Sequence, residues 1–334
     1  MNTMRCMVAD GPGRPLREKV RPLPVPGGYD VLLAVEACAV CRTDLHVVDG
    51  ELPEARYPVV PGHQAVGRVV AAGPAAVLRP GERVGACWLG GTCGHCDYCV
   101  SGRENLCGEA VFHGCSRDGG FASHMLADSR YCFALGDDQP AAATTPLLCA
   151  GLIGYRSLRL AGEASHVGIY GFGSAARLVT QVARARGQQV YAFTRPGDAA
   201  AQAFAIRSGA VWAGDSGATP PHALDAAIIF APAGELVPRA LRDIRRGGTV
   251  VCGGIHMSDI PGFPYADLWG ERVIRSVANL TRQDGSEFLA LASRERLTAE
   301  TTCYPLGAAN EALRALREGA ITGTSVLSCG TPGT

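Results

Sequence analysis

Four cysteines lie close together in the segment GTCGHCDYCVSGRENLC, at Cys93, Cys96, Cys99 and Cys107. Their spacing is C-x2-C-x2-C-x7-C, and four thiolates so placed can surround one Zn²⁺ ion tetrahedrally with no coordination position left open. An iron–sulfur cluster is the alternative, but the usual cluster sequence has proline after its last cysteine, whereas Gly108 follows Cys107. The spacing therefore predicts a structural zinc ion in the loop 90–107.

Three other segments, CRTDLH (41–46), PGHQAVG (61–67) and PLLCAG (146–151), carry residues that can bind a metal or move a proton: Cys41, Thr43, Asp44, His46, His63 and Cys149. None is diagnostic alone, because a single histidine more often forms hydrogen bonds and a single cysteine more often packs inertly. Two cysteines and one histidine together would leave one zinc position for substrate or water, which is the arrangement of a catalytic zinc.

A glycine-rich turn lies between a short apolar strand and a helical pattern in HVGIYGFGSAARLVTQVARARG (166–187). Gly171, Gly173 and Ala176 fit the pattern G-x-G-x-x-G/A in the strand–turn–helix context that a dinucleotide-binding turn requires. The first glycine allows the tight turn, and the second lets the backbone approach a pyrophosphate at the helix N-terminus. The turn predicts a bound nicotinamide dinucleotide.

The end of the next strand, VYAFT (190–194), indicates which nicotinamide cofactor binds. An acidic residue there would bind the ribose 2′-hydroxyl of NAD(H), whereas arginine accommodates the 2′-phosphate of NADP(H). Thr194 and Arg195 occupy this place, and Asp198 lies four positions beyond Thr194. The sequence therefore favours NADP(H) over NAD(H), although a solvated Arg195 could serve either.

The elements that position these residues change character near residue 152. Before it, short strands bounded by turn residues are predicted at 31–40, 67–73 and 81–88. After it, strands at 166–170, 190–194, 211–214, 224–230, 248–254 and 271–277 alternate with helical patterns, which indicates a parallel sheet built from βαβ units. Two helices, at 286–297 and 307–319, each precede a short β run. The predicted fold class is α/β, with a mostly β domain first.

The motifs at 41–46, 62–63, 93–107, 149 and 171–176 occur in the order found in zinc-containing medium-chain alcohol dehydrogenases, and the sequence resembles that family over nearly its whole length. The resemblance implies a GroES-like catalytic domain over 1–152, which carries the zinc loop 90–107. It implies a Rossmann domain, a doubly wound parallel sheet, over 153–283. A C-terminal segment, 284–334, would return to the catalytic domain.

The resemblance also implies residue roles. Cys41, His63 and Cys149 would bind the catalytic zinc, and Asp44 would hold the ring of His63. Thr43 would hydrogen-bond the reacting oxygen, and His46 would pass the proton to solvent through the cofactor ribose. Capping of a helix N-terminus is a second, compatible role for the Thr43–His46 segment. Cofactor contacts are expected at Arg42, Gly171, Gly173, Ala175, Ala176, Thr194 and Arg195, and substrate contacts at Trp88, Leu89, Leu52 and Cys115.

One residue departs from the family pattern. Gln64 follows His63 where the family has glutamate, which removes a negative charge and leaves a bound zinc more electrophilic. The predicted reaction is hydride transfer between NAD(P)(H) and a small primary or secondary alcohol or its carbonyl, with two zinc ions per chain. The alternatives are a reductase of a conjugated C=C or C=N bond, which Gln64 favours, and a non-catalytic cofactor-binding homologue. The retained Thr43 and His46 favour the alcohol reaction.

Composition excludes other classes. The chain has 334 residues, with 31 basic and 31 acidic side chains, so it lacks the basic footprint of a nucleic-acid-binding protein. No apolar run approaches the roughly 20 residues that span a bilayer, and the first residues lack a secretory signal. We expect a cytoplasmic protein that forms a homodimer or homotetramer, through the sheet edge near 271–277. Five scattered cysteines are expected to be small buried residues: Cys6, Cys132, Cys252, Cys303 and Cys329.

Overall fold

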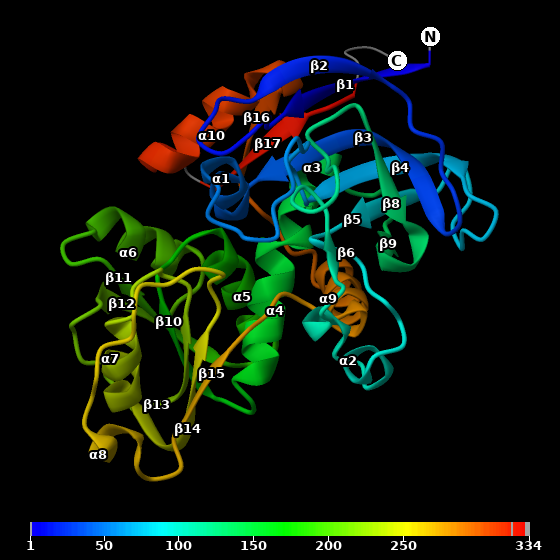
Figure 1. Ribbon diagram of the computed structural model, residues 1–334. Helices are drawn as coiled ribbons and strands as arrows, with labels where there is room; N and C mark the ends of the chain where they lie inside the picture. Colours follow the sequence, from blue (N-terminus) through cyan, green and yellow to red (C-terminus); the bar gives the residue numbers. More distant parts are fainter. Residues whose placement is uncertain (1, 322, 331–334) are drawn as a thin grey trace. The chain divides into compact units, whose positions relative to one another are not determined.

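The computed structural model describes residues 2–321 and 323–330, and the chain forms two compact units (Figure 1). The first contains the residues up to Cys149, Thr281–Ser286 and those from Ala299 onward. The second contains Ala150–Leu280 and Glu287–Thr298. The change of unit falls at Ala150, because helix α4 (Ala150–Leu160) begins there and packs against α5 (Ser174–Ala185).

The expected assignment of all of 284–334 to the catalytic domain differs from the structure over Glu287–Thr298. This stretch contains the end of α9 (Arg282–Arg294), and its Phe288 is fully buried against Tyr155 of α4, with ring centroids 5.7 Å apart. A Cβ on Gly151 would lie only 2.4 Å from the Phe288 ring, so the glycine makes this contact possible. Apolar burial therefore attaches the stretch to the second unit.

The first unit is built on a seven-stranded sheet with the order β16-β17-β3-β4-β5-β9, in which β8 also pairs with β3. A separate antiparallel pair joins β1 (Thr3–Val8) and β2 (Arg17–Pro22). The sheet strands are β3 (Asp30–Val40), β4 (Ala65–Ala72), β5 (Arg83–Ala86), β8 (His124–Asp128), β9 (Cys132–Ala134), β16 (Thr301–Pro305) and β17 (Thr324–Ser328). The three strands predicted for this half are confirmed as β3, β4 and β5.

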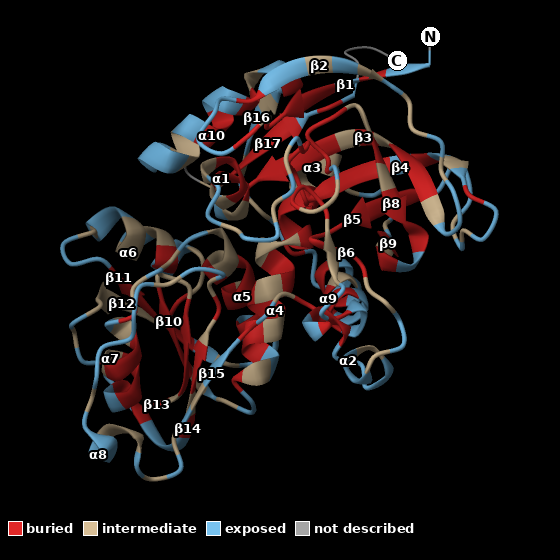
Figure 2. Ribbon diagram, viewed as in Figure 1, coloured by how far each residue is buried: buried red, intermediate tan, exposed pale blue. Residues whose placement is uncertain are grey.

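Strand β3 shows why the sheet has this centre. Its sequence, DVLLAVEACAV, is apolar at nearly every position and is buried along most of its length (Figure 2). Such a run is typical of a strand covered on both faces. The C-terminal strand β17 pairs antiparallel with β3, and β16 pairs parallel with β17, so the end of the chain lies in this sheet.

Short elements carry most of the residues of chemical interest in the first unit. Helix α1 (Arg42–Asp49) follows β3 directly, and α10 (Ala309–Glu318) lies against α1 and β17. The others are β6 (Leu89–Gly91), α2 (Asp97–Val100), η1 (Glu104–Leu106), β7 (Val111–Phe112), η2 (Ser129–Tyr131), α3 (Ala141–Thr144), η3 (Thr145–Leu148) and η4 (Leu306–Ala308).

The second unit is a six-stranded parallel sheet with the order β12-β11-β10-β13-β14-β15. In chain order this is 3-2-1-4-5-6, the order of a doubly wound dinucleotide-binding fold, so the predicted fold class is confirmed. The strands are β10 (His166–Tyr170), β11 (Gln189–Thr194), β12 (Trp212–Asp215), β13 (Leu224–Ile229), β14 (Ile244–Cys252) and β15 (Val273–Ser276). The remaining helices are α6 (Ala199–Arg207), α7 (Leu236–Asp243) and α8 (Tyr265–Leu268).

The central strands β10 and β13 are almost wholly buried (Figure 2). Of the scattered cysteines, Cys6 and Cys329 are buried as expected, Cys132 and Cys252 are half-buried, and Cys303 is exposed. The expectation for Cys303 is wrong because it lies on β16, the edge strand of its sheet. Within the described part of the chain, every helix is too short or too polar to cross a bilayer.

Candidate metal centres and cofactor-binding turn

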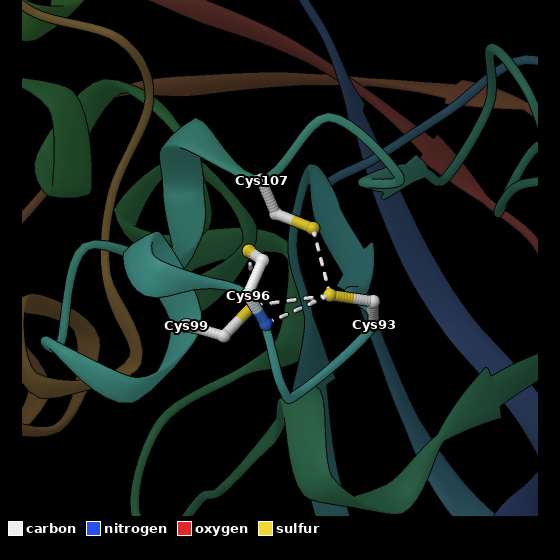
Figure 3. Close-up of side chains that lie close together, drawn as sticks. All are labelled: Cys93, Cys96, Cys99 and Cys107. Atoms are coloured by element: carbon white, nitrogen blue, oxygen red, sulfur yellow. Dashed lines mark hydrogen bonds between the residues drawn. The ribbon is translucent and has the colours of Figure 1, made fainter.

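The four cysteines of the loop converge on a common centre (Figure 3). All four Sγ atoms lie within 4.8 Å of one another, with 3.8 Å between Cys93 and Cys99, 3.6 Å between Cys96 and Cys99, and 3.6 Å between Cys107 and Cys93. A tetrahedral site with Zn–S bonds of about 2.3 Å places its sulfur atoms about 3.8 Å apart. The cluster therefore has the dimensions of a four-thiolate zinc site.

Local backbone geometry forms this cluster. Gly94 has φ 80° and Gly102 has φ 70°, a left-handed conformation that lets the loop turn back on itself. The backbone N–H of Cys96 donates to Cys93 Sγ at 3.4 Å. Backbone hydrogen bonds from His95 and Cys96 lower the pKa of the Cys93 thiol to about 6. The loop thus stabilises the thiolate of Cys93, the form that binds a metal, whereas hydrogen bonding within the cluster and burial raise the pKa of Cys96 to about 11.

The loop is also fixed to the body of the first unit. Thr92 accepts a hydrogen bond from the Cys99 thiol at 3.3 Å and bonds the Tyr131 hydroxyl at 2.6 Å. Glu104, only 3% exposed, accepts a hydrogen bond from the backbone N–H of Arg282 at 2.8 Å. A metal ion in the cluster would therefore rigidify a loop that Thr92 and Glu104 already attach to the rest of the first unit.

A second cluster brings together Cys41, His63 and Cys149, whose ligand atoms lie within 4.8 Å of one another. Cys41 caps the N-terminus of α1, His63 lies in the turn before β4, and Cys149 follows η3. The Cys41 Sγ and His63 Nε2 atoms are 3.3 Å apart, and a tetrahedral zinc with one sulfur and one nitrogen ligand requires about 3.5 Å. Three residues from distant segments thus fit a site with one open position.

Asp44 holds this cluster in place. Its Oδ1 accepts hydrogen bonds from His63 Nδ1 and from the Gly62 backbone N–H, both at 3.1 Å. Its Oδ2 accepts from the Cys41 backbone N–H at 2.9 Å, which closes a capping box on α1. Asp44 is 0% exposed. Orientation of the His63 ring and capping of the helix are therefore both functions of one carboxylate.

Without a metal, the pKa values of the cluster favour the protonated forms of Cys41 and His63. A hydrogen bond with Cys149 and burial raise the pKa of Cys41 well above its ordinary value. Burial lowers the pKa of His63, but Asp44 and Cys41 raise it more, so it lies well above its ordinary value. In the metal-free protein these groups hold protons that a divalent cation must displace, so metal binding releases protons.

Gln64, next to His63, is 1% exposed, and its Nε2 has no hydrogen-bond partner among the described residues. Thr43 and His46 are half-buried and lie three residues apart on α1, a spacing that puts them on one face of a helix. His46 Nδ1 contacts the Glu51 carboxylate just beyond the helix. Sequence reasoning missed Glu51, whose only signal is an acidic residue following the helix-ending Gly50.

The four residues expected to contact substrate differ in their packing and exposure. Trp88 packs edge-on against His63, with ring centroids 5.2 Å apart, and stacks on Phe112 at 5.0 Å. Leu52 is half-buried in the same apolar cluster. Leu89 and Cys115 are 1% and 0% exposed, so both side chains are buried, and their contact with a substrate stays a prediction. Phe112 is an aromatic neighbour that the sequence did not indicate.

The glycine-rich turn has the geometry that a dinucleotide requires. Gly171 has φ 88°, and a Cβ there would lie 2.7 Å from the Ala231 backbone nitrogen. Gly173 caps α5 without a side-chain bond, and a Cβ at Gly173 would meet nothing within 4 Å. Open space thus precedes the first backbone N–H groups of α5, which lack intrahelical partners and can bind phosphate. Ala175 is half-buried and Ala176 fully buried against the sheet.

At the end of β11 the nearby carboxylates are already engaged. Asp198 accepts from the Ala201 backbone N–H at 2.9 Å and caps α6. Asp215 accepts from the backbone N–H of Gly197 at 3.0 Å and from the Gln202 side chain at 2.8 Å. Arg195 is exposed, and its guanidinium has no hydrogen bond or ion pair within 2–321 and 323–330. The buried Thr194 hydroxyl bonds backbone carbonyls.

Comparisons with known proteins agree with this arrangement. Residues 27–137 match the alcohol dehydrogenase GroES-like domain. The probable alcohol dehydrogenase AdhA of Mycobacterium tuberculosis is 43% identical over 323 residues, which cover 94% of this chain and 92% of that protein. An alcohol dehydrogenase of Geobacillus stearothermophilus is 33% identical over 342 residues, covering 97% and 99% of the two chains.

Two solved structures extend the comparison. Acetophenone reductase of Geotrichum candidum, in complex with NAD, has a TM-score of 0.87 and 26% identity, with 98% of each chain covered. A putative zinc-binding dehydrogenase of Sinorhizobium meliloti, bound to NADP, has a TM-score of 0.85 and 25% identity, covering 98% of this chain and 100% of the other. The chain belongs to the zinc-containing medium-chain alcohol dehydrogenase family.

Proposed function

We propose that the chain is a zinc-dependent alcohol dehydrogenase, which transfers a hydride between NAD(P)(H) and a small primary or secondary alcohol or its aldehyde or ketone. The observation that carries this proposal is the cluster of Cys41, His63 and Cys149, with three ligands and its histidine fixed by the buried Asp44. A structural zinc site has four protein ligands, as in the loop with Cys93, Cys96, Cys99 and Cys107, whereas three ligands leave one position for substrate.

When bound, zinc at this cluster polarises the substrate oxygen, and the nicotinamide donates or accepts the hydride. The residues of the chain do the rest. Asp44 keeps Nε2 of His63 directed at the cluster. On α1, the Thr43 hydroxyl accepts a hydrogen bond from the alcohol hydroxyl, and His46 carries the released proton toward solvent. The stacked Trp88 and Phe112 keep the space beside His63 apolar and exclude water.

We further propose two zinc ions per chain, one at each cysteine cluster, and a preference for NADP(H). The exposed Arg195 supports the cofactor preference, since arginine at this place accommodates the 2′-phosphate of NADP(H). Asp198 and Asp215 accept backbone N–H groups through Oδ1, which ties both carboxylates to the protein's own backbone. Arg42, exposed at the start of α1, is the proposed additional cofactor contact. The proposed Rossmann part is the second unit, and the GroES-like catalytic part is the first.

We propose a homodimer or homotetramer formed through strand β15, which pairs with β14 alone among the described strands and exposes 45% of Val273. An unpaired sheet edge is a ready site for pairing with a second copy. The measured mass in solution tests this proposal. A cytoplasmic location is proposed because fourteen unpaired cysteines are typical of a reducing compartment, where disulfides are rare.

The activity is tested by incubating the zinc-loaded protein with a panel of alcohols, aldehydes, ketones and conjugated enones, with NADPH and NADH. We expect turnover of alcohols or carbonyls, and loss of that turnover in Cys41→Ala and His63→Ala. Turnover of enones alone would instead support the C=C reductase alternative. Binding of cofactor without any turnover would support the non-catalytic alternative.

A further inference from the structure

The end of helix α1 places a carboxylate against the His46 ring. Gly50 ends the helix in a left-handed conformation (φ 80°), and the chain then turns so that the Glu51 backbone N–H donates to the His46 carbonyl at 2.9 Å. The Glu51 side chain contacts Nδ1 of the same residue. Backbone and side chain of one residue thus both hold His46, and the pair is fixed by local structure.

A second carboxylate at the end of α1 pairs with an arginine. Asp49, the last residue of α1, forms a two-pronged ion pair with Arg317 of α10, at 2.7 and 2.9 Å. Such a bidentate pair is geometrically specific. Arg317 is also close enough to Glu51 for that carboxylate to contribute to its raised pKa, after Asp49. Asp49 is therefore paired with Arg317, while the Glu51 carboxylate contacts Nδ1 of His46.

We propose that Glu51 is a positioning residue for proton transfer, whose carboxylate accepts the Nδ1–H of His46 and so fixes Nε2 as the nitrogen that takes up the proton. A neutral imidazole carries its proton on one nitrogen only, and the partner of that nitrogen decides which. This inference deepens the proposed function and rests on it, because it assumes that His46 carries the proton released from the alcohol.

The proton balance of this step is simple. As the alcohol is oxidised, its O–H bond breaks, and the proton, passed along the relay, forms an Nε2–H bond on His46. The ring is then an imidazolium in contact with the Glu51 carboxylate. The proton next passes to water, and the ring returns to its neutral Nδ1–H form. The His46 and Glu51 side chains are 17% and 51% exposed, so the pair lies at the solvent boundary.

The test compares full-length, zinc-loaded variants: wild type, Glu51→Ala, Glu51→Gln, His46→Gln and the control Glu54→Ala. Glu54 is an exposed glutamate three residues after Glu51, so Glu54→Ala removes the same charge and keeps the contact between Glu51 and His46. Nitrogen-15 NMR of the histidine rings reports the tautomer, and the His46 signal is identified by its loss in His46→Gln. Steady-state alcohol oxidation gives kcat and KM for each variant.

We expect the Nδ1–H tautomer in the wild type and the Nε2–H tautomer in Glu51→Ala. Turnover in that variant should fall by about tenfold with KM changed by less than about twofold, a part of what general acid–base catalysis contributes. Glu51→Gln keeps an acceptor oxygen, so it should retain the tautomer and an intermediate kcat. Glu54→Ala should match the wild type in both measurements.

Each other outcome decides a different claim. Wild-type turnover in His46→Gln would refute the proton-carrying role of His46, and with it this part of the proposed function. Slow turnover in His46→Gln, together with an unchanged tautomer and kcat in Glu51→Ala, would overturn the assignment of Glu51 alone. If Glu51→Ala fails to fold, Glu51→Gln decides the matter, and wild-type kcat in that variant overturns the proposal.

Discussion

Replacement of Asp44 by asparagine tests the geometry of the proposed catalytic zinc site. The Asp44 carboxylate accepts three hydrogen bonds, from the Cys41 backbone N–H and from the Gly62 backbone N–H and His63 Nδ1. Asparagine keeps the shape, but one of its two polar atoms becomes a donor. In one orientation that donor faces the Cys41 N–H, and in the other it faces the Gly62 and His63 donors. Either orientation therefore disturbs one proposed zinc ligand.

The magnitude follows from burial, because Asp44 is 0% exposed. A buried donor that loses its acceptor costs about 1–3 kcal/mol, and about 1.4 kcal/mol corresponds to a tenfold change in an equilibrium constant. Asp44→Asn should thus weaken zinc binding at this cluster by about 10–100-fold, the usual range for loss of a group that orients a ligand. Turnover at limiting zinc should fall by a similar factor.

The assay is equilibration with a chelator of known zinc affinity, followed by measurement of zinc per chain and of turnover. The four-cysteine cluster is an internal reference, since Asp44 does not contact it. Asp97→Asn, an exposed carboxylate in the structural loop, is the matched control and should keep wild-type values. Wild-type zinc affinity and turnover in Asp44→Asn would show that Asp44 does not orient the ligands and that the reasoning is wrong.

Four further outcomes are expected. Cys96→Ser should lower Tm and remove the zinc ion of the four-cysteine cluster, while the Cys41 cluster keeps its zinc ion. Metal analysis and calorimetry measure the zinc content and Tm. Loss of both ions would contradict the independence of the two sites. Arg195→Ala should lower kcat/KM for NADPH by at least tenfold and change kcat/KM for NADH little. Tenfold corresponds to about 1.4 kcal/mol, the loss of a charge-assisted contact with the 2′-phosphate. A more than tenfold preference of the wild type for NADH would overturn the NADP(H) proposal. Trp88→Ala should raise KM for apolar alcohols, and an unchanged KM would place Trp88 outside the substrate site. Burial lowers the pKa of His113 to about 4 from an ordinary 6.5, so between these pH values only the unfolded state binds this proton. The free energy of unfolding should therefore fall by about 3 kcal/mol as the pH drops from 6.5 to 4. Chemical unfolding of wild type and His113→Gln checks this, and equal slopes of stability against pH in the two proteins would refute it.

The structural zinc cluster could be predicted from the sequence because its four ligands lie in one short loop, where spacing alone restricts the geometry. The glycine-rich turn was predictable for the same reason, since strand, turn and helix are contiguous. The ligands of the other cluster come from three segments up to 108 positions apart, from Cys41 to Cys149. No local pattern joins them, and only the resemblance to a family placed them together.

Other features depend on packing that no local pattern reveals. The burial of Leu89 and Cys115 is one example, because only the folded structure shows how little of each side chain is exposed. The attachment of Glu287–Thr298 to the second unit depends on Phe288 meeting Gly151 and Tyr155, a contact between residues distant in sequence. Glu51 reaches His46 only because Gly50 takes a left-handed conformation and turns the chain back. Such tertiary contacts, rather than propensity, decide these positions.

The central claim is that two separate cysteine clusters bind zinc, and that the one at Cys41 carries out the reaction. Zinc per chain, measured with turnover in wild type, Cys41→Ala and Cys96→Ala, tests it most directly. We predict two ions in the wild type, one ion and no turnover in Cys41→Ala, and one ion with retained turnover but lower Tm in Cys96→Ala. Two ions and full turnover in Cys41→Ala would contradict the account.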